Sequence, residues 1–199
     1  MKKGERRKQE LLRIAYKMFI TRGYENTSVD DIIAEAGIAK GTYYYYFESK
    51  EQTLEAVIEM MLDQEIEAAK QVMAAEIPVP QKIAGIITSI RPTQEEQPIE
   101  GVLMQPENVL MHNKIRRKLV EKAVPLLSEA VEEGIAEGIF ACDCIPERVR
   151  MLLLISSDIF DEGSFTEREV AVFIDMTEKL LGAEPGAMEF IRPLIGLEE

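Results

Sequence analysis

The chain of 199 residues predicts an all-α protein, with a three-helix domain at the N-terminus and a longer helical body after it. Apolar residues recur at intervals of three and four over most of the chain, which is the pattern of helices with one buried face. Two capping boxes, beginning at Ser49 and Thr166, mark helix starts. We therefore expect two domains, residues 1–48 and residues 49–199.

The first domain is expected to hold three short helices, at about residues 5–22, 29–36 and 40–46. Thr27 or Ser28 can cap the second helix by accepting a hydrogen bond from its first turn. Asp30 and Asp31 stand in that turn, where the positive end of the helix dipole favours acidic side chains. Gly37 is expected to end the helix, because glycine adopts positive φ without strain.

A run of tyrosines fills the third helix. Tyr43 and Phe47 are four residues apart and can both face the interior, which directs Tyr44 and Tyr45 outward. Exposed adjacent tyrosines are unusual, since a tyrosine ring normally buries its apolar body. A DNA groove or backbone would give these rings a surface to contact. The alternative is a packed aromatic cluster without any role in DNA binding.

Further helices are expected along the remainder of the chain. They cover about residues 49–75, 81–90, 106–138, 146–160 and 167–181, with a loop at residues 92–98. Pro125 is expected to kink or restart the long helix at 106–138, because proline removes a backbone hydrogen bond there. Pro146 suits the first turn of the next helix.

The residues of the first domain are arranged as in a known family. The sequence resembles the TetR family of transcriptional repressors at Leu11–Phe19, Gly23, Tyr24, Thr27–Val29, Ile32, Ala36, Gly37, Lys40–Thr42, Tyr44, Tyr46, Phe47 and Lys50. Beyond the first quarter of the chain the resemblance lies only in the number and length of helices. It implies a helix-turn-helix DNA-binding domain followed by a helical ligand-binding and dimerisation domain.

The resemblance also implies roles for individual residues. Positions that contact DNA in the family correspond here to Thr27, Ser28, Lys40, Gly41, Thr42, Tyr44, Tyr45, Tyr46 and Lys50. Tyr44 and Tyr45 match positions that contact bases or the sugar-phosphate backbone, and Thr27 matches a phosphate contact. Ala39 stands where serine is common, which removes a possible cap and phosphate ligand. Tyr43 replaces the usual leucine or phenylalanine and is expected in the core.

In the family, the last two helices pair with their copies in a second chain. The implied interface residues are Leu152, Ile159, Val170, Phe173, Ile174 and Thr177. The alternative is that these side chains pack only within one chain. A homodimer with two-fold symmetry would suit a palindromic DNA operator.

Family members also hold a small molecule among the C-terminal helices. The candidate pocket residues are Met61, Met104, Asn108, Met111 and His112. Methionine suits an adaptable apolar pocket, but it is equally an ordinary core residue. Asn108 and His112 lie one turn apart and could orient a ligand if they are buried; a surface histidine is the alternative. The many acidic residues would suit a cationic ligand, and a solvated surface explains them as well.

The charge of the chain is unevenly distributed. Residues 1–50 hold 10 Lys+Arg against 7 Asp+Glu, although the whole chain carries a net charge of −13. A basic N-terminal arm is formed by Lys2, Lys3, Arg6, Arg7 and Lys8. Such an arm can neutralise DNA phosphates, and a solvated tail is the alternative. The acidic remainder would be repelled by DNA, so we expect DNA to dock at the N-terminal end.

Other classes of protein and site find little support in the sequence. Cys142 and Cys144 supply only half of a tetrahedral zinc site, so we expect no metal and no cofactor, with a redox role left open. We find no phosphate-binding glycine loop and no nucleophile elbow, and therefore expect no enzyme. No segment resembles a signal peptide or a bilayer span, so we expect a cytoplasmic protein without a membrane partner.

These observations predict a sequence-specific DNA-binding transcriptional regulator. We expect a homodimeric repressor of a palindromic operator in double-stranded DNA, released from it by an unknown small-molecule ligand. The alternative is a TetR-like protein that uses DNA only as a locator and acts through contacts with another protein. An exposed apolar patch outside the dimer face would favour this alternative, whereas an enclosed pocket would favour the repressor.

Overall fold

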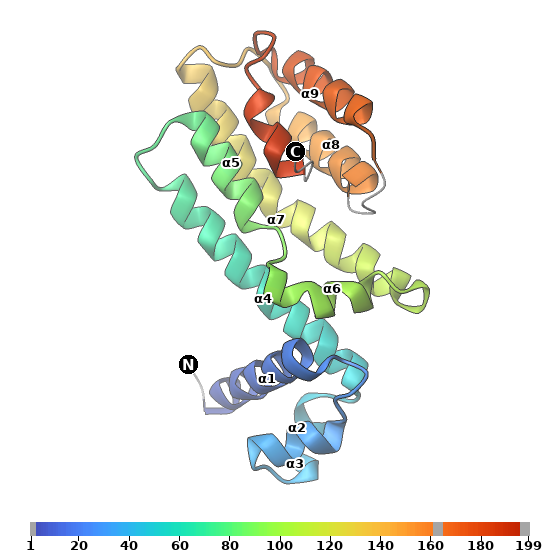
Figure 1. The fold of residues 1–199 in the computed structure, drawn as a ribbon. Helices are drawn as coiled ribbons and strands as arrows, with labels where there is room; N and C mark the ends of the chain where they lie inside the picture. The colour runs from blue at the N-terminus through green and yellow to red at the C-terminus, as the bar shows by residue number, and fades with distance from the viewer. Residues whose placement is uncertain (1–2, 161–164, 196–199) are drawn as a thin grey trace. The chain divides into compact units, whose positions relative to one another are not determined.

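The computed structural model describes residues 3–160 and 165–195, and every regular element in these ranges is helical, as predicted (Figure 1). The elements are α1 (Lys3–Arg22), α2 (Val29–Ala36), α3 (Lys40–Tyr46), α4 (Lys50–Met73), α5 (Val79–Ser89), η1 (Gln94–Glu96), α6 (Gln97–Leu103), η2 (Pro106–Asn108), α7 (Val109–Ala136), α8 (Ile145–Phe160), α9 (Glu167–Leu181) and η3 (Glu189–Ile195). In the described ranges, none of the helices combines the length and apolarity needed to cross a bilayer.

The chain forms two compact units. The first comprises residues 1–64 and 92–116, and the second comprises residues 65–91 and 117–199. Each unit is therefore assembled from two separate stretches of sequence. The expected division after residue 48 remains a prediction about which part of the chain folds independently.

A segment predicted as a loop contributes to the core of the first unit. The sequence predicted a loop at residues 92–98, but η1 and α6 occupy most of that region. Pro98 lies in the first turn of α6, where a missing backbone N–H costs little. Ile99, Val102 and Leu103 are buried in the same apolar cluster as the three N-terminal helices. Burial of these three side chains stabilises a helix of seven residues that could not persist alone.

The proline in the longest helix does not restart it. Pro125 lies inside α7, which runs from Val109 to Ala136. Ala123, Val124 and Leu127 are buried on either side of the proline. Packing of these side chains therefore holds the helix together across the position where one backbone hydrogen bond is lost.

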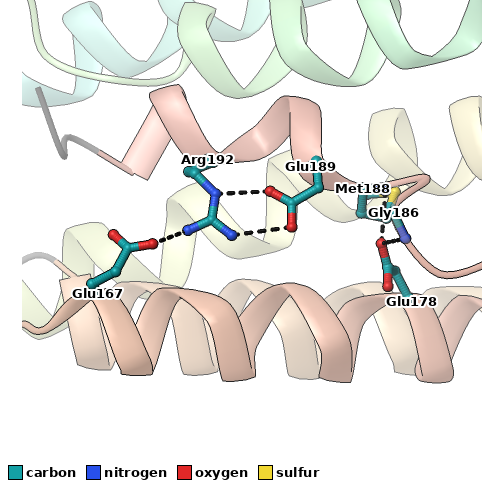
Figure 2. A network of polar contacts seen from close by, with 6 residues as sticks. All are labelled: Glu167, Glu178, Gly186, Met188, Glu189 and Arg192. Carbon is teal, nitrogen blue, oxygen red and sulfur yellow. Dashed lines mark hydrogen bonds and ion pairs between the residues drawn. The ribbon is translucent and has the colours of Figure 1, made fainter. Parts of the chain in front are cut away.

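The C-terminal segment of the second unit is tied to both ends of α9 (Figure 2). The carboxylate of Glu178 is buried and accepts the backbone N–H groups of Gly186 at 2.8 Å and Met188 at 3.1 Å. Arg192 donates to Glu189 at 2.7 and 3.0 Å and also to Glu167 at the start of α9. These polar contacts hold η3 against α9, and η3 also contacts α5.

Candidate nucleic-acid interface

The second helix begins at a well-formed cap. The hydroxyl oxygen of Ser28 accepts the backbone N–H of Asp31 at 3.1 Å, and the Asp31 carboxylate accepts the backbone N–H of Ser28 at 2.9 Å. The two hydrogen bonds from Ser28 hold the pKa of the Asp31 carboxyl below its ordinary value. Because the folded-state pKa is depressed, this cap stabilises the helix above the usual carboxyl range and is lost as pH falls through the lowered pKa.

The turn after α2 depends on a left-handed glycine. Gly37 has φ of 60°, a conformation that only glycine adopts without strain, and its N–H donates to the carbonyl groups of Ala34 and Ile33. Ile38 then donates its N–H to the Ile33 carbonyl at 3.3 Å. This turn aligns the start of α3 beside the start of α2, as the ion pair between Lys40 and Asp30 at 3.0 Å shows.

The tyrosines of α3 divide between the interior and the surface as predicted. Tyr43 is 0% exposed and Phe47 is 2% exposed, whereas Tyr44 is 47% and Tyr45 is 81% exposed. The ring of Tyr46 is half-buried and packs edge-on against Tyr45, with 4.9 Å between ring centroids. The two outward rings thus lie on the face of α3 opposite its buried side, free to meet a ligand.

The buried tyrosine makes a polar link that the sequence did not indicate. The hydroxyl group of Tyr43 lies 2.5 Å from that of Thr53 and 3.3 Å from the carbonyl oxygen of Ser49. Thr53 in turn donates to the same carbonyl at 3.0 Å. Burial raises the pKa of the Tyr43 hydroxyl above its ordinary value. These contacts fasten α3 to the first turn of α4.

The cation at the start of α4 is held in place by Tyr24. The ammonium of Lys50 donates to the Tyr24 carbonyl at 3.0 Å and lies 4.0 Å from the centre of the Tyr24 ring. The Tyr24 hydroxyl donates to Glu51, and burial together with Glu51 raises the pKa of Tyr24. Lys50, at the start of α4, therefore holds its charge against the segment between α1 and α2.

One predicted DNA contact lies inside the domain. Thr27 is 0% exposed, its hydroxyl donates to the Gly23 carbonyl at 2.9 Å, and its backbone N–H donates to the Tyr24 carbonyl at 3.1 Å. Both polar hydrogens of Thr27 are thus already used. This placement argues against the predicted phosphate contact, and Thr27 instead supports the loop that carries the exposed Ser28.

The basic N-terminal residues belong to a helix. Because α1 begins at Lys3, Arg6, Arg7 and Lys8 extend from a helical surface, which corrects the alternative of a solvated tail for these residues. Arg7 pairs with Glu10 at 2.8 Å, and the ammonium of Lys8 lies 5.8 Å from the centre of the Phe47 ring. Lys2 lies outside the described residues. The start of α1 therefore adds positive charge near the end of α3.

The structure brings most of the predicted contacts together around α3. The exposed members are Ser28, Lys40, Gly41, Tyr44 and Tyr45, and the half-buried members are Thr42, Tyr46 and Lys50. Ala39 caps α3 without a side-chain hydrogen bond, as expected from the absence of serine. A short helix with exposed tyrosines and a cation in its first turn is suited to entering the major groove beside a phosphate backbone.

Comparison with known proteins identifies this domain. Residues 11–57 match the profile of a family described as bacterial regulatory proteins, tetR family. Over 141 residues the chain is 30% identical to the HTH-type transcriptional repressor KstR2 of Mycolicibacterium smegmatis, and the alignment covers 69% of each protein. The chain belongs to the TetR family. It is a TetR-family transcriptional regulator with a helix-turn-helix DNA-binding domain.

Solved structures support the same fold. A transcriptional regulator from Cytophaga hutchinsonii superimposes with a TM-score of 0.62 at 17% identity, covering 93% of this chain and 96% of the other. A TetR-family transcriptional regulator from Pectobacterium atrosepticum gives a TM-score of 0.59 at 23% identity, covering 91% and 96%. At these identities the likeness concerns the TetR fold alone.

The predicted pocket residues of this TetR-family chain all lie in the first unit. Met61 is buried, Met111 and His112 are half-buried, and Met104 is 39% exposed. The side-chain amide of Asn108 donates to the Val102 carbonyl at 2.8 Å. That bond uses one of its two amide hydrogens and leaves its carbonyl oxygen available as an acceptor.

The predicted dimer residues mostly face the interior of the chain. Leu152, Val170, Phe173, Ile174 and Thr177 are buried, and Ile159 is half-buried. The exposed apolar residues of the last two helices are different ones: Met151 and Leu154 on α8, and Val172 on α9. A buried face and an interface face have the same helical spacing, so periodicity does not separate them.

The two cysteines do not form a site with other ligands. Both are free thiols, and burial raises the pKa of Cys142, which makes it a poorer nucleophile at neutral pH. Cys144 is exposed. Over the described part of the chain, no group of three or more His, Cys, Asp or Glu side chains is placed to hold a metal ion.

Proposed function

We propose that this chain is a homodimeric repressor that binds a palindromic operator and is released from it by a small molecule. The observation that carries the DNA-binding half of the proposal is the outward pair Tyr44 and Tyr45 on a helix whose other face is fully buried. Repression is supported by the relative KstR2, which is a transcriptional repressor. The homodimer, the operator and the ligand are inferred from the family resemblance.

Within the operator complex, we assign base reading to the exposed rings and positioning to the cations. Tyr44, Tyr45 and the methyl group of Thr42 would meet base edges in the major groove. Lys40, at the start of α3, and Lys50, at the start of α4, would bind phosphates and fix the helix in its groove, together with the backbone at Gly41. Ser28 and Tyr46 would add phosphate contacts beside them.

Replacing Tyr44 with alanine is expected to weaken operator binding by about 1–3 kcal/mol, since one base contact is lost. Binding to an unrelated duplex should change little. The Tyr44→Phe variant keeps the ring, and so separates contacts of the ring from those of the hydroxyl. Affinities measured by fluorescence anisotropy at one fixed salt concentration test this, and an unchanged operator affinity in the folded alanine variant would remove Tyr44 from the interface.

Selection of DNA from a random duplex pool by the purified protein tests the proposal as a whole. We expect enrichment of one palindromic sequence, with two half-sites about one helical turn apart. Enrichment of a sequence without internal symmetry would argue against the homodimer on DNA. No enrichment by folded protein would count against sequence-specific repression.

For the homodimer, we propose the exposed apolar residues Met151, Leu154 and Val172 as the contact with a second copy. The Leu154→Lys variant is expected to raise the dimer dissociation constant at least tenfold, equivalent to about 1.4 kcal/mol, because a charge would be buried in the interface. Ile77→Lys is the matched control, since Ile77 is 37% exposed and lies outside α8 and α9. Sedimentation velocity over a dilution series measures both, and equal effects would reject this interface.

For the small-molecule ligand, we propose a binding site formed by the half-buried Met111 and His112 with Met61, Met104 and Asn108.

A second candidate function, a protein-interaction factor, is favoured by the apolar residues exposed around the start of α7, which are Met104 at 39%, Val109 at 50% and Leu110 at 82%. Release of the selected operator in a small-molecule screen would favour the repressor. Operator binding that responds only to another protein would favour the second candidate.

A further inference from the structure

The helix-turn-helix segment is poor in positive charge. Between residues 23 and 49 the sequence contains one cation, Lys40, and five acidic residues, which are Glu25, Asp30, Asp31, Glu35 and Glu48. Phosphate attraction dominates the affinity of most DNA-binding domains. Within this segment only Lys40 can attract a DNA phosphate, so a contact that occupies it reduces what the segment itself contributes to affinity.

The ammonium of Lys40 forms an ion pair with an acidic side chain of the same segment. The ammonium of Lys40, in the first turn of α3, lies 3.0 Å from a carboxylate oxygen of Asp30, in the first turn of α2. Asp30 raises the pKa of Lys40 through this contact. Both side chains are largely exposed, at 63% for Lys40 and 74% for Asp30, so the pair is open to competition from a phosphate.

The cap of α2 does not require Asp30. The cap of α2 is made by Ser28 with Asp31, and its hydrogen bonds do not involve Asp30. A carboxylate in the first turn of a helix gains from the helix dipole, but that gain requires no contact with α3. Glu35, on the same helix, is also exposed and makes no such pair with Lys40.

We propose that Asp30 limits the affinity of the DNA-binding face by competing with DNA phosphate for Lys40. This inference rests on the proposed DNA-binding function and names a regulating residue of that same face. In free protein the Lys40 ammonium is held by Asp30. To bind DNA, Lys40 must leave Asp30, and the freed carboxylate then stands near the phosphate backbone, which repels it. Asp30 is thus a positioning residue that keeps operator binding weak enough to be reversed.

The test compares Asp30→Asn with Glu35→Gln, which removes the same charge from the same helix without touching Lys40. We expect Asp30→Asn to tighten binding about two- to fivefold, to the selected operator and to an unrelated duplex alike. The slope of log affinity against log salt concentration should stay the same, because Lys40 neutralises one phosphate in both proteins. Glu35→Gln should have a smaller effect on affinity.

A second comparison shows whether Asp30 acts through Lys40. In a Lys40→Gln background, Asp30→Asn is expected to tighten binding no more than Glu35→Gln does. The inference would be overturned if Asp30→Asn bound DNA no more tightly than Glu35→Gln. It would also be overturned if Asp30→Asn kept its full effect in the Lys40→Gln background. If unmodified protein prefers no DNA sequence, the proposed repressor function fails, while the affinities of the two variants for the unrelated duplex still decide the role of Asp30.

Discussion

The Tyr43→Ala variant is expected to lose about 3–5 kcal/mol of unfolding free energy and to bind no operator. Tyr43 is fully buried, with its ring centroid 5.8 Å from that of Phe47, so alanine would leave a cavity beneath α3. It would also remove the hydroxyl link to Thr53. A helix of seven residues depends on its neighbours, so α3 should lose order before the rest of the chain does.

The Tyr43→Phe variant serves as the matched control. It keeps the ring and removes only the hydroxyl, so we expect a loss of about 1 kcal/mol, typical of one hydrogen bond. Thr53 retains its own hydrogen bond to the Ser49 carbonyl and is not left unpaired. Urea denaturation of both variants measures the difference. Equal losses would mean that the hydroxyl, and not the ring, anchors α3.

Gly182→Ala is expected to destabilise the second unit by at least about 3 kcal/mol, for two reasons that add. Gly182 ends α9 with φ of 64°, where an L side chain is strained by about 1–2 kcal/mol. A Cβ atom there would lie 2.2 Å from the carbonyl oxygen of Ala141, a backbone atom. Ala141 cannot retreat freely, because its N–H donates to the Leu181 carbonyl at 2.9 Å.

Gly138→Ala separates these two causes. Gly138 follows α7 with φ of 77°, but a Cβ atom at this position would meet nothing within 4 Å. We therefore expect a loss of only about 1–2 kcal/mol, from backbone strain alone. Thermal unfolding followed by circular dichroism compares the two variants. If Gly182→Ala lowered stability no more than Gly138→Ala, the close approach to the Ala141 carbonyl would not contribute to the loss of stability.

Local patterns in the sequence predicted the helix-turn-helix segment closely. The start of α3 at Lys40 and its end at Tyr46 agree with the structure, and so do the positive φ of Gly37 and the outward rings of Tyr44 and Tyr45. Each of these features depends on residues within one or two turns of each other. Helix spacing and capping chemistry are sufficient to predict such features.

Features that depend on distant residues were missed. The polar segment with Pro92 and Pro98 looks like a loop until the core that receives Ile99 is known. The partner of the Tyr43 hydroxyl belongs to another helix, and the burial of Thr27 follows from the packing of the whole unit. The same limit applies to α8 and α9, where spacing shows that a face is apolar but not which partner covers it.

The contribution of α6 to the first unit has a consequence for synthesis on the ribosome. The DNA-reading helices are translated first, yet Ile99, Val102 and Leu103 of their apolar cluster follow only after residues 65–91 have been made. At about 5–20 residues per second, the nascent DNA-binding helices wait for seconds with an unfilled core. During that interval the chain exposes apolar surface of the kind that chaperones bind, and it acquires its complete DNA-binding unit only when α6 has left the exit tunnel.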